Sequence, residues 1–399
     1  MSSTAEQMRA WTGPALLTYG FRPFFLGAAV WAALAMALWV PMLAGRLALP
    51  TAFDPVSWHA HEFLFGYLGA VVAGFLLTAV PNWTGRLPIV GWPLGGLFAL
   101  WLGGRIAVAV SLHLQPIAVA VADLSLPVVL GAVIAREIVA GKNWRNLMVL
   151  GILAVFTLGN AAFHWEAARG GYPAQGYGLR FGLAAALMMI AVIGGRIVPS
   201  FTRNWLVRRG AGRLPAPPMG AFDKLAILVL LAALALWIAG PDAMATGAAL
   251  ALAGILHLAR LARWAGDRSL PEPLLLVLHA GYALLPLGAL AMAVEALASG
   301  HLGMGAAQHI WMAGAIGLMT LAVMTRATLG HTGRELTAGA GTTAIYLALV
   351  AAVLARLAAG IWPGQASFLH ALSALAWIGA FGGFAALYGP LLLRPKPQE

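Results

Sequence analysis

Histidine is the residue type in this sequence whose placement indicates chemistry. The chain has 10 His, 13 Asp and Glu, and no Cys. Without thiolates, a bound transition metal or haem iron would take its ligands from imidazole, supported by carboxylate, Tyr or Met. The same absence excludes disulfides, cysteine-ligated iron–sulfur clusters and c-type haem. The depth of each histidine in the fold therefore decides which of them could share a centre.

The elements that carry these histidines are membrane-spanning helices. Hydrophobic residues make up 61% and charged residues 9% of the 399-residue chain, and the mean hydropathy is +0.86. A soluble domain carries roughly 25% charged residues, so the composition excludes a soluble enzyme, a disordered chain and a nucleic-acid binder. We predict an all-α, polytopic membrane bundle of about 12 transmembrane helices. The apolar runs that predict them are 24–43, 57–80, 91–111, 114–135, 145–166, 176–198, 221–240, 243–264, 271–297, 304–325, 339–360 and 366–391.

These spans are expected to form a single integral membrane domain over residues 1–399. The longest polar stretch is a predicted cytoplasmic loop at 202–220. We expect 1–20 to be a short cytoplasmic N-terminus and 392–399 a cytoplasmic tail. The N-terminus does not read as a secretory signal, because it is polar and contains Glu6 and Arg9.

Lys and Arg predict the orientation of the bundle. Of the 24 Lys and Arg, nineteen fall at the termini or in loops on the same side as the termini, and one, Arg105, falls within a span. The four on the opposite side are Arg46, Arg169, Arg180 and Arg356. Positive charge is retained on the cytoplasmic side. We therefore expect a multi-pass protein of the bacterial inner membrane with both termini in the cytoplasm.

A faint internal repeat accompanies the spans. The second, sixth and tenth spans each end in a polar tail with Thr and Arg, at 78–86, 196–205 and 322–334. The motif recurs every four helices, as it would in three four-helix repeats. Proline and arginine after a membrane exit are common, so chance recurrence is the alternative.

Five histidines from four spans are predicted at the outer leaflet level: His59, His61, His164, His309 and His370. Ionisable groups at membrane depth are costly and usually functional. Taken singly, each could be a hydrogen-bonded packing residue, but together they favour a haem or metal cluster. His59 and His61 are two residues apart and point about 200° apart on an α-helix, so both cannot face one metal. His279, in the cytoplasmic half of the ninth span, could serve a second centre or only pack.

Two buried carboxylates are candidates for proton transfer. Glu62 lies inside the second span and shares the face of His59, while Glu295 lies level with the histidines. Arg105 and Asp123 lie at compatible depth in adjacent spans and are expected to form a structural ion pair. The remaining histidines and one methionine are expected in solvated or packing roles: His113, His257, His301, His331 and Met324.

Several motifs resemble the NnrS family over nearly the whole chain. They are 20–25 (GFRPFF), 58–67 (WHAHEFLFGY), 74–85 (GFLLTAVPNWTG), 194–205 (GGRIVPSFTRNW), 278–282 (LHAGY) and 317–334 (GLMTLAVMTRATLGHTGR). The resemblance implies a polytopic membrane protein of the bacterial nitric oxide response that binds haem and copper. Phe63 stands where the family would lead us to expect Met, and Gln308 where we expect His. The family's recurrent histidines match His59, His61, His279, His309 and His331.

Combining depth and resemblance, we expect haem b, with copper as a second metal. The predicted haem-binding residues are His59, His61, His164, His279, His309 and His370, and the predicted metal ligands are His59, His61, His309 and His331. Three functions follow. The first is reduction of nitric oxide at a haem, with electrons from quinol or an external donor. The second is non-catalytic binding that senses nitric oxide or protects metals. The third is transport of copper or haem.

Overall fold

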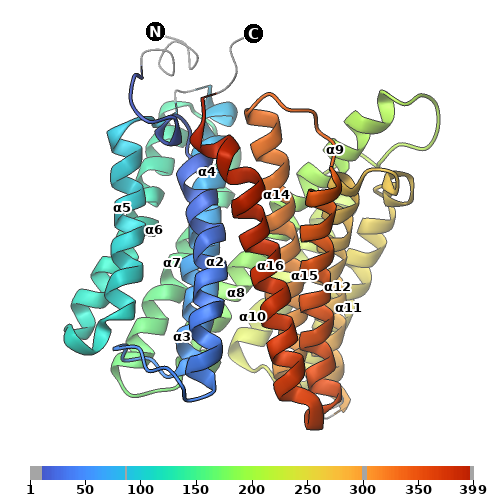
Figure 1. The fold of residues 1–399 in the computed structure, drawn as a ribbon. Helices are drawn as coiled ribbons and strands as arrows, with labels where there is room; N and C mark the ends of the chain where they lie inside the picture. Colours follow the sequence, from blue (N-terminus) through green and yellow to red (C-terminus); the bar gives the residue numbers. More distant parts are fainter. Residues whose placement is uncertain (1–10, 86–87, 299–302, 396–399) are drawn as a thin grey trace. The chain divides into compact units, whose positions relative to one another are not determined.

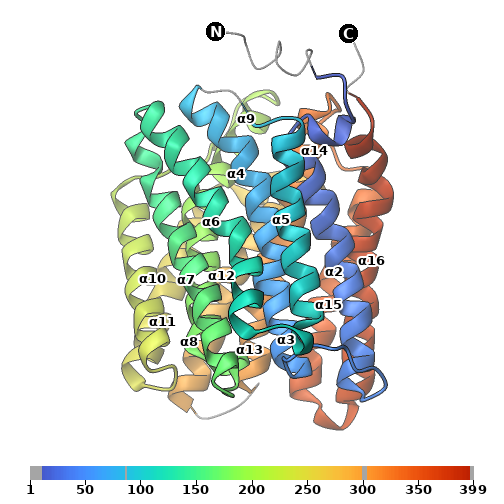
Figure 2. The same ribbon diagram turned by 90° about the vertical axis from the view of Figure 1, so that its left-hand side faces the viewer.

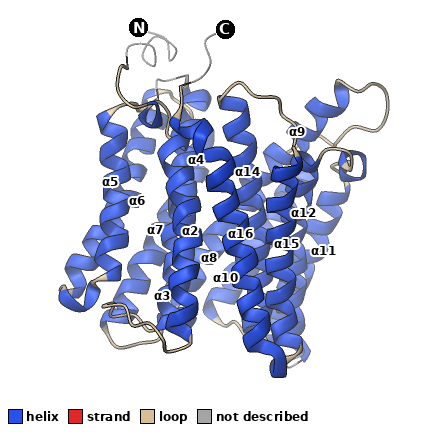
Figure 3. Cartoon of the chain, in the orientation of Figure 1, coloured by secondary structure: helices blue, strands red, loops and turns tan. Residues whose placement is uncertain are grey.

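The computed structural model of the chain describes residues 11–85, 88–298 and 303–395. Within these ranges the chain is helical and contains no strand (Figure 3). Twelve helical spans are long and apolar enough to cross a membrane, so the predicted all-α, multi-pass fold is confirmed. The spans are α2 (Phe21–Leu43); α3 (Pro55–His61), η2 (Glu62–Tyr67) and α4 (Leu68–Thr84); α5 (Trp92–Ala109); α6 (Pro116–Ala140); α7 (Leu147–Ala168); α8 (Tyr177–Met189), η6 (Ile190–Gly194) and α9 (Gly195–Val207); α10 (Ala221–Ala239); α11 (Met244–Ala262); α12 (Pro273–Ala298); α13 (Met304–His309), η8 (Ile310–Ile316) and α14 (Gly317–His331); α15 (Ala340–Ile361); and α16 (Ala366–Leu393). Short 3-10 turns occur at η1 (Ala15–Leu17), η3 (Ser111–His113), η4 (Trp144–Asn146), η5 (Pro173–Gln175), η7 (Gly266–Ser269) and η9 (Pro363–Gln365).

The spans that end in the polar tails are longer than predicted. Their helices continue to Thr84, Val207 and His331, through Pro81 in α4 and Pro199 in α9. The apolar runs stop earlier because polar residues begin there, but an α-helix can continue into the polar interface. The connection expected at 202–220 is therefore non-helical only from Arg208 to Gly220. Of the predicted terminal segments, 1–10 and 396–399 lie outside the described residues.

The described chain forms two compact units. The first contains residues 1–182, 327–335 and 381–399, and the second contains 183–326 and 336–380. In the first unit, α5 lies beside α6 and α6 beside α7, while α2 packs on α4 (Figure 2). In the second unit, α11 packs against both α10 and α12, and α11 and α12 lie side by side in Figure 1. α8, α14 and α16 each contribute to both units.

Within the first unit, the start of α2 and the end of α16 lie together. The buried guanidinium of Arg22 donates hydrogen bonds to the carbonyls of Leu392 (2.8 Å) and Arg394 (2.7 Å). A cation at a helix C-terminus satisfies its last carbonyls and complements its dipole. An even number of membrane crossings requires that the first span begin and the last span end on the same side of the membrane.

A π-helical segment occurs in the second, sixth and tenth spans, as η2, η6 and η8. These are also the spans with the polar tails. In their most apolar stretches 72–78% of residues are buried, against 28–61% in the other nine spans. A π-helical turn inside an α-helix often marks a functional position. Three four-helix repeats would each carry such a π segment. The repeat itself stays a prediction.

Candidate functional site

The N-terminus of α3 places the first two residues of the site. The carboxylate of Asp54 accepts hydrogen bonds from the backbone N–H groups of Val56 (2.9 Å) and Ser57 (3.0 Å), with Pro55 in the first turn. This cap and proline define where the helix begins. His61 and Glu62 follow one and a half turns later and are both fully buried. The helix changes to the π form at Glu62.

Arg105 joins two carboxylates in the interior of the first unit. Its Nη1 donates to Glu62 Oε1 at 2.6 Å, and its Nη2 donates to Asp123 Oδ1. The predicted ion pair between Arg105 and Asp123 is therefore present, and Glu62 is a second partner. Glu62 Oε2 also accepts from Trp31 Nε1 at 2.7 Å. The guanidinium thus offsets one of two buried negative charges.

Two histidines complete this group, which we call the buried cluster (Trp31, His61, Glu62, Arg105, Asp123, Asn160 and His164). His61 Nδ1 lies 3.0 Å from Glu62 Oε1, and His61 Nε2 lies 3.1 Å from Asp123 Oδ2. His164 Nε2 lies 3.0 Å from the same Asp123 oxygen. Asn160 bridges them, because its Nδ2 donates to Asp123 Oδ2 at 2.7 Å while its Oδ1 lies 3.0 Å from His61 Nε2. α3, η2, α5, α6 and α7 all contribute.

The π segment makes room for this arrangement at Gly66. A Cβ at Gly66 would lie 2.5 Å from Arg105 Nη1 and 2.8 Å from Glu62 Oε2, so only glycine fits. The carbonyl of Gly66 accepts a hydrogen bond from Trp101 Nε1 at 2.9 Å. Buried backbone carbonyls need such partners. Trp101 therefore ties α5, which carries Arg105, to the turn that carries Glu62.

In the buried cluster, ring nitrogens of two histidines face oxygen acceptors, and each such pair needs a proton or a metal ion between its atoms. Both ring nitrogens of His61 face acceptor atoms, and His164 Nε2 faces a carboxylate. Protons on the two Nε2 atoms meet this need, and so would a metal ion bound to both Nε2 atoms and to Asp123 Oδ2.

The chemistry of the donors also fits a metal. His61, Asp123 and His164 each offer one ligand atom, and these atoms lie within 4.8 Å of one another. Two ligands at metal bond lengths of about 2.1 Å are about 3.0–3.4 Å apart, close to the separations observed. Two histidines and one carboxylate suit non-haem iron(II) or zinc. Glu62 lies beside Nδ1, the second ring nitrogen of His61, and a carboxylate commonly accepts a hydrogen bond from a metal-bound histidine in this way.

The family model described as NnrS protein matches residues 15–396. The chain belongs to the NnrS family. Membership suggests a role in the response to nitric oxide. No curated protein matches the chain. The buried cluster of this NnrS protein combines residues of the 58–67 segment with residues from four other spans, α2, α5, α6 and α7.

Two other predicted metal ligands, His59 and His331, contact aromatic side chains. His59 stacks on Trp39 with ring centroids 4.0 Å apart, as expected for a residue two positions from His61. His331 stacks on Phe21 at 5.3 Å. Glu62, expected on the face of His59, contacts His61, because the helix leaves α geometry at Glu62.

His309, His370 and Glu295 are predicted site residues in the second unit. His309 Nδ1 lies 2.6 Å from the carbonyl of Gly305. His309, Arg356 and His370 are close enough to interact electrostatically. Glu295 is buried in α12.

His279 Nε2 lies 2.9 Å from Thr202 Oγ1 in the second unit. Its Nδ1 is buried and has no hydrogen-bond partner among the described residues. His113 is exposed in η3, as predicted. His301 lies outside the described residues.

The expectation that His257 is solvated is wrong. Its side chain is fully buried, with Nδ1 2.8 Å from the hydroxyl of Tyr282 and Nε2 3.1 Å from the carbonyl of Ala226. Arg260, which we counted as a cytoplasmic charge, is also fully buried. It donates to Asp223 Oδ1 at 2.6 Å and to the carbonyl of Ala191, inside η6, at 2.8 Å. Depth along a helix can be counted from sequence, but the face a residue occupies cannot.

A haem does not fit at the buried cluster. The cavity beside it has a volume of about 20 Å³, whereas ligand pockets occupy roughly 300–1,000 Å³. Both nitrogens of His61 are already engaged. A metal ion fits these residues and a macrocycle does not. The haem prediction therefore stays a prediction about the remaining histidines of the predicted haem-binding set: His59, His279, His309 and His370.

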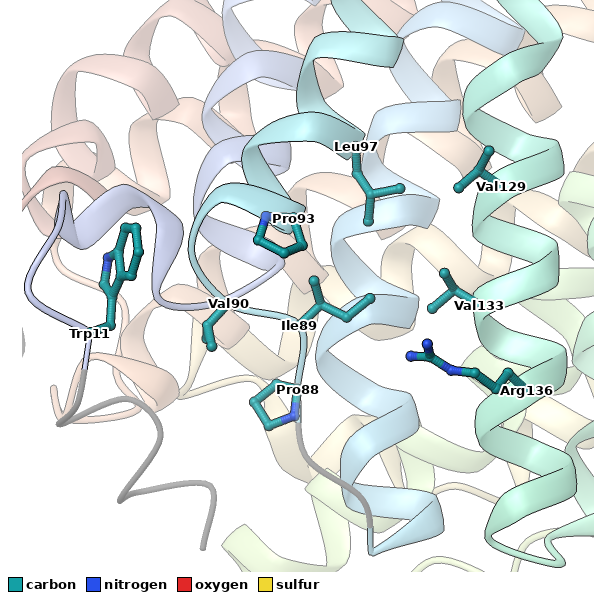
Figure 4. Close-up of a pocket in the computed structure, with 9 residues that line it drawn as sticks. All are labelled: Trp11, Pro88, Ile89, Val90, Pro93, Leu97, Val129, Val133 and Arg136. Atoms are coloured by element: carbon teal, nitrogen blue, oxygen red, sulfur yellow. The ribbon is translucent and has the colours of Figure 1, made fainter. Parts of the chain in front are cut away.

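A larger hollow of about 660 Å³ lies at the opposite end of α5 and α6 from the buried cluster. Trp11 and the Pro88–Val90 stretch form one wall, and Val129, Val133 and Arg136 of α6 form another (Figure 4). The described residues that line it include no histidine and no carboxylate.

Asn160 and Trp31 were not identified as site residues from the sequence. A signal for Asn160 exists, because it precedes His164 by one helical turn and is polar at membrane depth.

Proposed function

We propose that this protein binds nitric oxide at a non-haem metal centre held by His61, Asp123 and His164. The observation that carries the proposal is the meeting of three ligand atoms from three spans in a buried cluster. A redox-active ion such as iron(II) or copper supplies an open coordination position for the gas. Family membership supports the choice of nitric oxide.

The chain's own residues have distinct roles in this proposal. Glu62 accepts a hydrogen bond from the Nδ1–H of His61 and so orients the Nε2 of His61 toward the other ligands. Arg105 pairs with both Glu62 and Asp123 and so offsets part of their negative charge. Asn160 orients Asp123 through a hydrogen bond.

Metal content of the detergent-purified protein tests the proposal. Iron, copper and zinc are counted in the wild type and in His61→Ala, His164→Ala and Asp123→Asn. We expect metal stoichiometric with the chain in the wild type and a loss in all three variants. His113→Ala, an exposed histidine of the same unit, is the matched control and should retain it. Wild-type protein without metal after supplementation, or variants that keep it, would overturn the proposal.

Reduction of nitric oxide is the finer form of this function. Two nitric oxide molecules, two electrons and two protons give nitrous oxide and water, with quinol or an external donor as the electron source. Glu62 is the buried carboxylate nearest the ligands and supports proton delivery. Anaerobic consumption of nitric oxide with a reductant, compared between wild type and Glu62→Gln, tests it. Binding without consumption would leave the protein as a sensor or metal-protecting binder.

Haem b and copper are tested in the same preparation. Visible spectra of oxidised and dithionite-reduced protein report a b-type haem if one is bound. Loss of haem in His279→Ala or His309→Ala, with the metal at His61 retained, would place it in the second unit. Absence of any bound metal or haem would favour a transporter.

A further inference from the structure

A small cavity lies directly beside the buried cluster, inside the first unit. Its volume of about 20 Å³ has room for about one molecule the size of water. One end is polar, where Arg105, Asp123 and Asn160 line it. The rest is walled mainly by apolar side chains, among them Phe65, Leu126, Leu130, Leu153 and Phe156.

One side-chain donor at the polar end has no partner. The Nε–H of Arg105 is buried and without a hydrogen-bond partner among the described residues, while its Nη1 and Nη2 hold Glu62 and Asp123. Both carboxylate oxygens of Asp123 already accept hydrogen bonds. Both polar atoms of Asn160 are engaged with His61 and Asp123. A buried donor left unmet costs about 1–3 kcal/mol, so an occupant that accepts from it is favoured.

The lining selects among occupants of this size. A buried water typically makes about three hydrogen bonds, and most of the wall here is apolar and offers it none. An ion would lose its hydration to mostly apolar walls. An uncharged molecule with one weak acceptor atom and otherwise apolar surface satisfies the donor and suits the walls.

We propose that this cavity is the binding pocket for an uncharged diatomic gas, held with one atom against Arg105 Nε. The inference rests on the proposed function, because Asp123 both lines the cavity and is a proposed metal ligand. It adds the site at which the gas is held before and during contact with the metal. Arg105 is then a positioning residue for the ligand.

Variants that change the volume of the cavity test this assignment. Gly69 lines the cavity, and a Cβ built there would meet only Phe156 Cε1, at 4.0 Å. Gly69→Ala and Gly69→Val therefore fill space without displacing a neighbour at the Cβ, while Leu153→Ala enlarges the cavity. Gly96→Ala on α5, where no atom lies within 4 Å of the new Cβ, is the matched control.

The measurements are metal content, the association rate of nitric oxide with metal-loaded protein, and the infrared N–O stretch in water and in deuterium oxide. Filling the cavity should slow association by about tenfold, because the walls must then move to admit the gas. Leu153→Ala should accelerate it, and Gly96→Ala should leave it unchanged. A shift of the N–O stretch in deuterium oxide would report the N–H donor.

The two proposals fail in different ways. Wild-type protein without metal at His61 overturns the metal centre and the pocket that depends on it. Metal-loaded protein that binds nitric oxide at the same rate in wild type, Gly69→Ala, Gly69→Val and Leu153→Ala overturns the pocket alone. An N–O stretch that is the same in water and in deuterium oxide overturns the contact with Arg105.

Discussion

Replacing Arg105 by methionine removes the one cation that pairs with both carboxylates of the buried cluster. The side chain keeps a similar length, so the change is mainly one of charge and hydrogen bonding. Glu62 and Asp123 are then left with two buried negative charges and the imidazoles as their partners. Breaking a buried pair by removal of one partner costs about 3–5 kcal/mol. We expect the free energy of unfolding to fall by that amount.

A double-mutant cycle separates the ion pair from packing. Glu62→Gln alone removes one charged acceptor and should cost about 1.5–3 kcal/mol. In the double variant Arg105→Met/Glu62→Gln, position 62 carries no charge. The loss of the guanidinium therefore leaves no unpaired carboxylate at that position. The double variant should therefore be about 1–3 kcal/mol more stable than the sum of the single effects predicts.

Unfolding by increasing mole fraction of SDS in mixed micelles, followed by circular dichroism, measures all three variants. Arg213→Met is the matched control, because Arg213 pairs with Asp267 at the surface, where the two side chains are 54% and 63% exposed. Surface pairs contribute about 0–1 kcal/mol. Equal effects of Arg105→Met and Arg213→Met, or strict additivity in the cycle, would refute the reasoning that a charge network holds these spans together.

Three further predictions concern other parts of the chain. Gly195→Ala should destabilise by about 1–3 kcal/mol, because its Cβ would clash with Arg260, which Asp223 and Ala191 hold in place; Gly103→Ala, with open space around its Cβ, should be neutral or stabilising in the same SDS titration. Trp101→Phe should cost about 1–3 kcal/mol by leaving the Gly66 carbonyl unpaired, and Trp165→Phe at an exposed position should not, as unfolding followed by circular dichroism will show. The hydrogen bond from Arg213 lowers the pKa of Asp267. The stability that this hydrogen bond contributes is present above the usual aspartate pKa and is lost as the pH falls through the lowered value. Protease cleavage of the 208–220 connection should accordingly increase at acid pH, and a wild-type pH profile in Asp267→Asn would contradict this.

Hydropathy and spacing were enough to predict the membrane spans, because each depends on about 20 consecutive residues. The ends of the second, sixth and tenth spans were predicted too early, since a helix can continue where the apolar run has stopped. The π segments were not predicted, because their backbone pattern depends on partners elsewhere in the chain. Trp101 and Arg260 supply such partners to carbonyls inside η2 and η6.

The candidate site was visible in part. Counting depth along each span put His61 and His164 at one level, placed Glu62 in the same span as His61, and gave Arg105 and Asp123 depths compatible with each other. It treated them as separate groups, because depth says nothing about which face of a helix carries a side chain. His257 shows the same limit in reverse, since it was expected in solvent and is fully buried.

By itself the sequence determined that this is a helical membrane protein with twelve spans, free of cysteine chemistry, and that costly ionisable residues lie within its apolar helices. These are local properties of composition, run length and residue type. Only the tertiary structure decided that Arg105 bridges Glu62 and Asp123, that His61 and His164 meet on one carboxylate, and that a small cavity remains beside them. Those contacts depend on which spans are neighbours and how each is rotated about its axis, and residues about 100 positions apart along the chain, such as His61 and Asn160, acquire that relation only when the helices pack.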